Sequence, residues 1–323
     1  MRMLAVIAAA SLVVCGLKPV LAEDWPTHPL TMVVPWAAGG GTDVMGRIMA
    51  KRMAEILGQP VIVENIPGGG GMVGSAHVAR SEPDGYTFVF GSRSDAIDMT
   101  LYKHPIYSFK DDLTPVVLVA DQPTILVARE DLTVNGLRDF VDYLKKNAST
   151  VKMGSAGIGA TGTVDCTLFN DKIGINVQPI PYRGSGPAMQ DLIARQFDYF
   201  CTISGSAVSP VQNNLVKGIA VFKKDRMPSL PNVPTSYEQG IPFEGSTWFG
   251  FLAPKNTPPE IVKKLHDASV DAMETPEVQK QLANNGTYVF PPDQRSTEYF
   301  QSIIVPEIEK NGAPLKAAGV SVD

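Results

Sequence analysis

Short apolar runs alternate with amphipathic segments along most of the chain. Strands are predicted where apolar and β-branched residues cluster, at residues 30–34, 60–64, 87–90, 124–128, 151–154, 176–181, 199–203 and 218–222. Helices are predicted where apolar residues recur at helical spacing, at residues 44–57, 73–80, 137–147, 164–173, 187–195 and 206–214. The first helix has a core-facing stripe formed by Met45, Ile48, Met49, Met53 and Ile56. This alternation predicts an α/β fold of parallel sheets with helices on both faces.

The chain beyond Gly250 has a different pattern. Helices are predicted there at residues 259–274, 276–284, 297–311 and 314–318, with one short apolar run at residues 288–290. We expect this block to pack back onto the first part of the chain. The sequence thus predicts two lobes, each a sheet flanked by helices: residues 23–123 plus 245–323, and residues 124–244. The chain passes between them near residues 121–125 and 243–251, where hinge bending is expected.

Two glycine-rich segments each join a predicted strand to a predicted helix. Residues 35–43 read PWAAGGGTD, and residues 154–163 read GSAGIGATGT. Glycines let several backbone N–H groups turn toward one point, and the following helix adds unpaired N–H groups and the positive end of its dipole. Each segment therefore predicts a cradle for a carboxylate or another anion. Two such cradles suggest a ligand held between two lobes.

The first 22 residues predict the compartment. Arg2 precedes an apolar run over residues 3–17, and Ala22 is the small residue that a signal-peptidase site needs. A membrane anchor is the alternative, but the run is shorter than the roughly 20 apolar residues of a spanning helix. A lipoprotein would carry Gly or Ala where Val14 precedes the cysteine. We therefore predict a signal peptide cleaved after Ala22 and a periplasmic protein.

The charge of the chain bears on its partners, and its cysteines predict a covalent cross-link. The formal net charge is −5, and loss of the signal peptide leaves 26 basic against 33 acidic residues, a net charge of −7. This balance argues against a nucleic-acid partner. Cys166 and Cys201 remain after cleavage and predict a disulfide in an oxidising compartment, because helix starts and strand ends meet at one edge of a parallel sheet. Two buried thiols are the alternative.

Several motifs imitate enzyme sites without completing them. Residues 69–74 and 157–162 match G-x-G-x-x-G, but neither is followed by an acid at the end of the next strand, as a nicotinamide site requires. A phosphate loop at residues 69–75 would need a lysine that is missing. The four histidines form no metal-ligand pair, and no G-x-S-x-G elbow is present. We therefore expect no cofactor, no metal and no chemistry on the ligand.

Four motifs occur in order: PWAAGGGTD at residues 35–43, ENIPGGGGMVG at residues 64–74, PDGYT at residues 83–87 and YRGSGPA at residues 182–188. They resemble the signature of the Bug/TctC family, the extracytoplasmic solute-binding proteins of tripartite tricarboxylate transporters. The resemblance covers the whole chain after the predicted signal peptide. It implies a two-lobed, Venus-flytrap binding protein, active as a monomer, that delivers a small carboxylate to membrane permease subunits.

The resemblance also implies which residues hold the ligand. Loops matching residues 36–43 and 157–163 grip it from opposite lobes, through backbone N–H groups and hydroxyls. The predicted ligand-binding set is Trp36, Ala38, Gly39, Gly40, Ser92, Arg93, Gly159, Ala160, Thr161, Thr163, Tyr182, Arg183 and Ser204. Asp43 is expected to cap its helix and brace the first loop.

Two assignments stay open. Arg93, where relatives carry a neutral stretch, either pairs with a second ligand carboxylate or forms an ion pair with Asp95, Asp98 or a surface acid. The loop at residues 65–71 is either a wall of the cleft or a tight turn within the first lobe. Both questions concern the ligand rather than the fold.

The function predicted from these observations is non-enzymatic binding of a small mono- or dicarboxylate, aromatic ones included, in the periplasm. One alternative is a binding protein that presents its liganded lobes to a membrane receptor instead of a permease. A secreted enzyme is the other.

Overall fold

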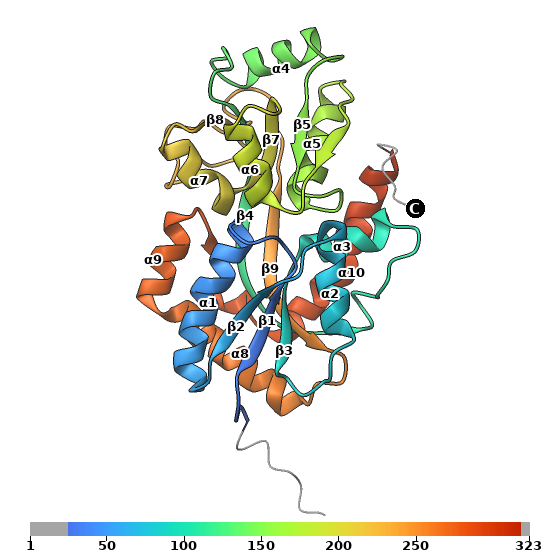
Figure 1. Ribbon diagram of the computed structural model, residues 1–323, viewed down its shortest axis with the longest axis vertical. Coiled ribbons are helices and arrows are strands. Elements are labelled where there is room, and N and C mark those ends of the chain that lie inside the picture. The colour runs from blue at the N-terminus through green and yellow to red at the C-terminus, as the bar shows by residue number, and fades with distance from the viewer. Residues whose placement is uncertain (1–24, 318–323) are drawn as a thin grey trace, which may run out of the picture.

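The computed structural model describes residues 25–317, with side chains as far as Lys310. The predicted signal peptide lies outside this range. The described residues form two lobes stacked along the long axis of the molecule, the first at the bottom of Figure 1 and the second at the top. Within the described range, no helix is both long enough and apolar enough to cross a membrane.

The first lobe contains residues from both ends of the chain. Its elements are β1 (Leu30–Val34), α1 (Gly41–Leu57), β2 (Val61–Asn65), the short helix η2 (Gly69–Gly71), α2 (Met72–Ala79), β3 (Thr87–Ser92), α3 (Arg93–Leu101), α8 (Pro259–Glu274), α9 (Pro276–Asn284), β10 (Tyr288–Val289), η3 (Pro292–Gln294) and α10 (Thr297–Ala317). The second lobe contains α4 (Leu137–Lys146), β5 (Met153–Ser155), α5 (Thr161–Lys172), β6 (Pro179–Pro181), α6 (Ser185–Ile193), β7 (Tyr199–Ile203), α7 (Ser204–Gln212) and β8 (Val216–Val221).

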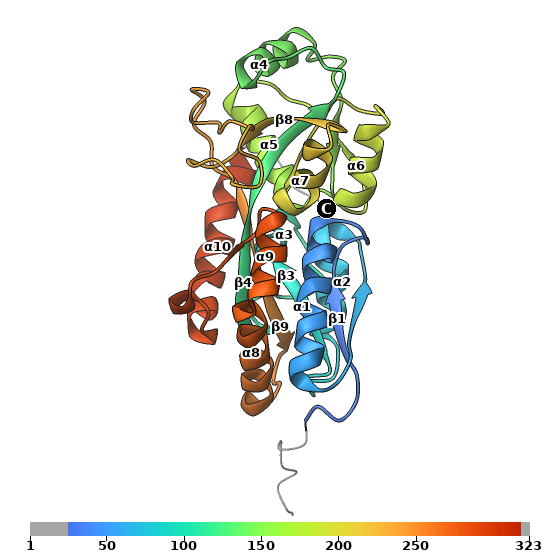
Figure 2. The same ribbon diagram turned by 90° about the vertical axis from the view of Figure 1, so that its left-hand side faces the viewer.

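Two long strands, β4 (Leu113–Arg129) and β9 (Ser246–Pro254), connect the lobes. Residues 113–123 of β4 pair with β9, and residues 124–129 pair with β7 and β8 of the second lobe. Gln122 lies opposite Thr247, and Pro123 lies opposite Ser246. The two chain segments that pass between the lobes therefore form one hydrogen-bonded ladder. Figure 2 shows β4 running from the first lobe up into the second.

The sheets are mixed, so the prediction of parallel sheets was wrong in part. β1 pairs in parallel with β2 and β3, and β5 pairs in parallel with β6 and β7. β4 and β9, however, are antiparallel to their neighbours. A strand covered on both faces reads as a continuous apolar run whatever its direction, so the sequence pattern could not separate the two cases.

Helices cover both faces of the first-lobe sheet because the strands are apolar on both. Alternate residues of β1 point to opposite faces: Met32 lies in the core with Met45 and Met49 of α1, while Val33 lies in the core with Phe300 of α10. The predicted stripe of α1 is therefore buried, apart from its partly buried rim residues. Burial of each of these large side chains stabilises the lobe by about 1.5–3 kcal/mol.

Three parts of the fold escaped prediction from the sequence. α3 was missed because its buried face carries Ser94, Asp95 and Asp98, which hide the apolar stripe. The first half of β4 contains Pro115, beside a register shift, and was not recognised as a strand. The segment of β9 was predicted only as a place where the chain passes between the lobes, and not as a strand. In addition, α10 is one helix over Thr297–Ala317 instead of the two predicted.

Candidate ligand-binding site

A cavity lies between the lobes. It is lined by Trp36, Gly40, Gly41, Thr42, Ser92, Ser94, Ala156, Ala160, Thr161, Gly162, Ser185, Cys201, Thr202, Ile203, Thr247 and Phe249. The cavity volume is about 30 Å³. None of the lining residues carries a charge. They offer hydroxyl groups, backbone groups and the faces of two aromatic rings.

Five helices begin at this cavity. α1 starts at Gly41, α3 at Arg93, α5 at Thr161, α6 at Ser185 and α7 at Ser204, and cavity residues lie at or beside each start. The positive end of each helix dipole therefore lies beside the enclosed space. An anion placed there is stabilised without any basic side chain.

The residues that precede three of these helices explain why the helix starts remain available. The N-cap positions of α1, α5 and α7 are Gly40, Ala160 and Ile203, and none makes a side-chain cap. Ser, Thr, Asp or Asn usually fills this position and accepts from a first-turn N–H. A glycine or an apolar residue cannot do so. The Gly41 N–H of α1 donates to Ser206 Oγ and the Thr161 N–H of α5 donates to Ser94 Oγ, so only the first-turn N–H groups without such a partner can serve a ligand.

Two polar atoms of the cavity wall are buried without a hydrogen-bond partner among the described residues: Trp36 Nε1 and Thr202 Oγ1. Burying an unpaired donor or acceptor costs about 1–3 kcal/mol. A polar ligand within reach of either atom would remove part of that cost. The wall is therefore better suited to a polar ligand than to an apolar one.

The lobes touch around the cavity, and glycines make the contact possible. The Gly41 N–H donates to Ser206 Oγ at 2.7 Å. A Cβ on Gly70 would lie 2.7 Å from Gly159 Cα, and one on Gly186 would lie 3.0 Å from the Ala38 carbonyl oxygen. Real Cβ atoms essentially never lie within 3.0 Å of another group, so a side chain on Gly70 would push the lobes apart, and one on Gly186 would require its neighbour to shift.

Five predicted ligand residues line the cavity: Trp36, Gly40, Ser92, Ala160 and Thr161. Thr161 Oγ1 lies 3.1 Å from Thr247 Oγ1 and 3.3 Å from Ser94 Oγ, so the cavity wall is a connected set of hydroxyls.

Four other predicted residues lie near the cavity but not in its wall: Ala38, Gly39, Gly159 and Thr163. The Thr163 hydroxyl lies 2.9 Å from Ser155 Oγ. Ser204 is buried elsewhere, where its hydroxyl donates to the Gly286 carbonyl at 2.8 Å. Lining residues outside the glycine-rich segments were also missed, among them Ser94 in α3, Thr202 in β7, and Thr247 and Phe249 in β9.

Asp43 braces the first glycine loop, as predicted. Its carboxylate accepts from the Gly39 N–H at 3.0 Å, from Asn65 Nδ2 at 3.0 Å and from Arg47 at 2.9 Å. Burial acts to raise the pKa of this carboxyl, but the hydrogen bonds from Arg47, Gly39 and Asn65 hold the pKa below its ordinary value. Asn65 also donates to the Trp36 carbonyl at 2.9 Å. The loop at residues 65–71 thus supports the cradle from behind.

A second pocket adjoins the cavity on the outer side of Trp36. We call it the outer pocket; it is lined by Trp36, Gly68, Gly69, Gly70, Tyr102, Ala156, Gly157, Ile158, Pro181, Tyr182 and Arg183. Trp36 and Ala156 belong to both spaces. The predicted ligand residues Tyr182 and Arg183 therefore lie in the outer pocket and not in the cavity wall. Arg183 is exposed there.

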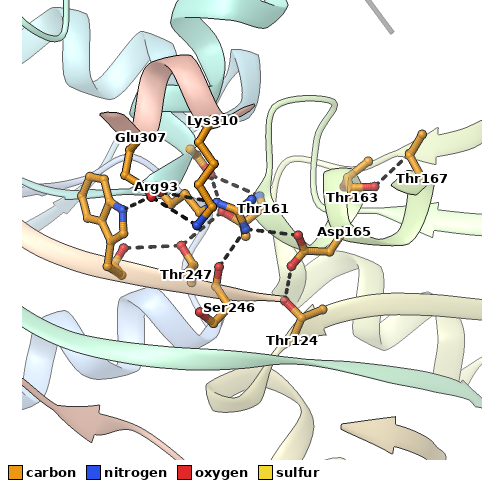
Figure 3. A network of polar contacts seen from close by, with 12 residues as sticks. Arg93, Thr124, Thr161, Thr163, Asp165, Thr167, Ser246, Thr247, Glu307 and Lys310 are labelled. Atoms are coloured by element: carbon orange, nitrogen blue, oxygen red, sulfur yellow. Dashed lines mark hydrogen bonds and ion pairs between the residues drawn. The ribbon is translucent and has the colours of Figure 1, made fainter. Parts of the chain in front are cut away.

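Arg93 lies outside the cavity wall, so the structure does not support a direct role in binding the ligand. Its guanidinium forms an ion pair with Asp165 of the second lobe at 3.1 Å and donates to the Ser246 carbonyl at 2.9 Å. Glu307 of α10 lies 3.8 Å from it on the other side (Figure 3). Arg93 thus forms an ion pair, as the alternative prediction had it, but its partners are Asp165 and Glu307 and not Asp95 or Asp98. Arg93 bridges the two lobes behind the cavity.

Cys166 and Cys201 form a disulfide, with their Cα atoms 5.4 Å apart. The bond joins the second turn of α5 to β7. Beside it, a Cβ on Gly162 would lie 2.4 Å from the Cys201 carbonyl oxygen, so the start of α5 rests directly on the strand. The disulfide therefore fixes one cradle helix against the strand that leads into the start of α7.

Within the described residues, no group of three or more histidines, cysteines or acids could hold a metal ion. No hydroxyl of the cavity wall has a histidine partner. The arrangement can desolvate a small anion and surround it with backbone dipoles and hydroxyls.

Comparison with known proteins agrees with this geometry. Residues 45–320 match the family model of the tripartite tricarboxylate transporter family receptor, TctC. The periplasmic binding protein BugD is 35% identical, with a TM-score of 0.89 over 92% of this chain and 99% of that one. MatC from Rhodopseudomonas palustris with bound malate is 32% identical, with a TM-score of 0.87 over 90% of this chain and 100% of that one. The R. palustris protein Rpa4515 with adipate is 29% identical, with a TM-score of 0.87 over 92% and 99%.

The chain therefore belongs to the tripartite tricarboxylate transporter receptor family and has the periplasmic binding protein fold.

Proposed function

We propose that this member of the tripartite tricarboxylate transporter receptor family captures a small carboxylate in the cavity between its lobes and delivers it to a membrane permease. The observation that carries the proposal is the meeting of five helix starts around a cavity without charged side chains. Dipoles and hydroxyls that are already in place favour an anion. The malate and adipate bound by two related structures support a carboxylate as that anion.

The affinity expected from such a site is sufficient for capture. A hydrogen bond to a charged group contributes about 1.5–3 kcal/mol. Three or four of them, less the cost of immobilising the ligand, reach about −8 kcal/mol, which corresponds to a micromolar dissociation constant. No buried arginine is required, in keeping with the position of Arg93 outside the cavity.

The outer pocket extends the proposal to longer ligands. Its walls include the rings of Trp36, Tyr102 and Tyr182, with the exposed Arg183 beside them. We propose that a short ligand occupies the cavity alone, whereas the distal part of a longer dicarboxylate or an aromatic acid reaches past Trp36 to these residues. The guanidinium would then pair with the second carboxylate.

The proposed route to the periplasm is export with a signal peptide cleaved after Ala22. We also propose that the ligand leaves chemically unchanged, because no nucleophile and base are paired in the cavity wall. Mass analysis of malate and adipate after prolonged incubation with the protein would detect any turnover.

The function is tested by titrating the purified protein with paired ligands. Malate, adipate and benzoate are each compared with the corresponding amide, which keeps the shape but loses the charge. We expect at least one carboxylate to bind with micromolar affinity in calorimetry and to raise the melting temperature, while its amide does neither. Equal binding of acid and amide, or no binding across the set, would refute carboxylate capture.

A further inference from the structure

One face of α3 forms part of the boundary between the lobes. Ser94, Ile97, Asp98 and Leu101 are spaced three and four residues apart, so they share a face. Ser94 contacts Thr161 of α5 through their hydroxyls. Ile97 and Leu101 form an apolar cluster with Val164 of α5. The second lobe therefore covers this whole face of a first-lobe helix.

Asp98 is the acidic residue on that covered face. Its side chain is fully buried, and neither carboxyl oxygen has a hydrogen-bond partner among the described residues. The nearest part of the second lobe is Gly159, where an added Cβ would lie 2.1 Å from Asp98 Oδ1. Gly70 of the first lobe lies against the same glycine. The Asp98 carboxyl thus points at the place where the two lobes meet backbone to backbone.

Among the described residues, no cation acts on the pKa of Asp98, and the one charge that does is that of Asp95 on the same helix. Tyr102 follows the last residue of that helix, and the phenol of Tyr107 donates to Asp95. The glycine loop of the second lobe that covers it has no titratable residue. At the start of α3, Arg93 is engaged by Asp165 of α5 and by Glu307 of α10.

Burial, with the charge of Asp95 in addition, raises the pKa of Asp98 well above its ordinary value when the lobes are together. Moving the lobes apart would carry Gly159 and α5 away and return the carboxyl to water, where a carboxyl has a pKa of about 3.9. An ionised carboxylate without a partner is costly to bury, and it takes up a proton instead.

We propose that Asp98 binds a proton as the lobes close, so that capture of the ligand takes up one proton and tightens as the pH falls. This inference rests on the proposed function, because it needs lobes that close on a ligand. Asp98 is a positioning residue here: it touches the opposite lobe and not the ligand.

The sign and size of the effect follow from linkage. The closed form has the higher proton affinity, so low pH favours it. Between the pKa of the open form and that of the closed form, the dissociation constant should rise by up to about tenfold for each unit of pH. Above the pKa of the closed form, closure must bury a charge, and the slope disappears while the affinity stays low.

The test measures the affinity for malate and adipate by calorimetry across a pH range in which both ligands stay fully ionised, from about pH 6.5 upward. Repeating each titration in buffers of different ionisation enthalpy counts the protons taken up. We expect weaker binding with rising pH and uptake approaching one proton for the wild type. Asp98→Asn keeps the size but cannot ionise, so its affinity should be constant and no proton should be taken up.

Asp165→Asn is the control, because Asp165 is also a buried acid at the lobe boundary. Burial raises the pKa of Asp165 as well, but Arg93 and Thr124 act to lower that pKa, whereas Asp98 has no such partner among the described residues. Asp165→Asn should retain the pH slope. A wild type whose affinity does not change with pH, or a slope that persists in Asp98→Asn, would overturn the inference while leaving carboxylate capture intact.

If none of malate, adipate and benzoate binds, the proposed function fails and small-angle scattering of the unliganded protein decides the inference alone. Compaction of the wild type on acidification, absent in Asp98→Asn, would support it. An unchanged radius in both proteins would overturn it.

Discussion

Gly41 in the first lobe lies directly against Gly205 in the second. A Cβ on Gly41 would lie 2.8 Å from the Gly205 carbonyl carbon and 2.9 Å from the Ser206 nitrogen. The lobes thus meet through bare backbone at the edge of the cavity. This contact lets the first-turn N–H of α1 donate across the boundary to Ser206. The glycine-rich loop therefore serves the closure of the lobes as well as the binding of an anion.

The first prediction is that Gly41→Ala separates folding from closure. Gly41 is the first residue of α1, where alanine favours the helix by about 0.5–1 kcal/mol. The unliganded protein should therefore unfold at the same or a slightly higher temperature. The clash with Gly205 exists only when the lobes are together and should cost about 1–3 kcal/mol, which lowers affinity by roughly ten- to a hundredfold. Calorimetry measures the expected loss of affinity, and thermal unfolding measures the expected unchanged or slightly higher unfolding temperature. A variant that binds as tightly as the wild type would show that closure tolerates a side chain here.

The second prediction concerns the ion pair between Arg93 and Asp165, whose side chains are 13% and 2% exposed. Arg93→Met leaves a buried carboxylate without its cation and should destabilise the protein by about 3 kcal/mol. Asp165→Asn in the same chain should restore much of that loss, because the uncompensated charge is gone. Chemical denaturation of the two single variants and the double variant measures the coupling.

The ligand preference of the same variants should not change, in contrast to their stability. Since Arg93 lies outside the cavity wall, the ratio of affinities for malate and for a monocarboxylate such as lactate should not change in Arg93→Met. A selective loss of malate binding would return Arg93 to the ligand site.

The sequence predicted the strands and helices whose faces are clearly apolar. β1 and β7 have the predicted bounds, and α8 and α9 match as well. α3 escaped because a buried helix face that carries serine and aspartate looks like a loop until the opposite lobe covers it. β9 escaped because its length and antiparallel partners are set by strands far away in the chain.

The site was predictable where the backbone itself forms it. Gly40, Ala160 and Thr161, which line the cavity, could be predicted because a glycine-rich strand-to-helix junction is recognisable from sequence. Thr202 and Thr247 were not predictable, because single threonines within strands look the same whether they face a cavity or a neighbouring strand. For Arg93 the sequence left a ligand contact and an ion pair open, because its partner Asp165 lies 72 residues away in the chain.

The third prediction concerns the disulfide between Cys166 and Cys201. Replacing both cysteines by alanine should lower stability by about 2–4 kcal/mol, since the bond closes a loop across a sequence separation of 35 residues. Affinity should also fall, because α5 would lose its anchor on β7. Intact mass after alkylation without reductant should show no free thiol in the wild type. Two added alkyl groups on the denatured protein would contradict the bond.

The last prediction uses two threonines of the same helix to ask whether hydroxyls in the cavity hold the ligand. Thr161 lines the cavity, where its hydroxyl contacts Ser94 and Thr247, whereas the Thr163 hydroxyl contacts Ser155 outside the cavity wall. Both side chains are 3% exposed, so valine has the same shape and a comparable burial at each position. Thr161→Val removes a group that can donate to a carboxylate, worth about 1.5–3 kcal/mol, and should weaken every carboxylate tenfold or more. Thr163→Val should instead lower the free energy of unfolding by about 1 kcal/mol and change affinity by less than about threefold. Calorimetry with malate and adipate, together with chemical denaturation, separates the two effects. Equal losses of affinity in both variants would mean that the helix start, and not the individual hydroxyl, determines binding.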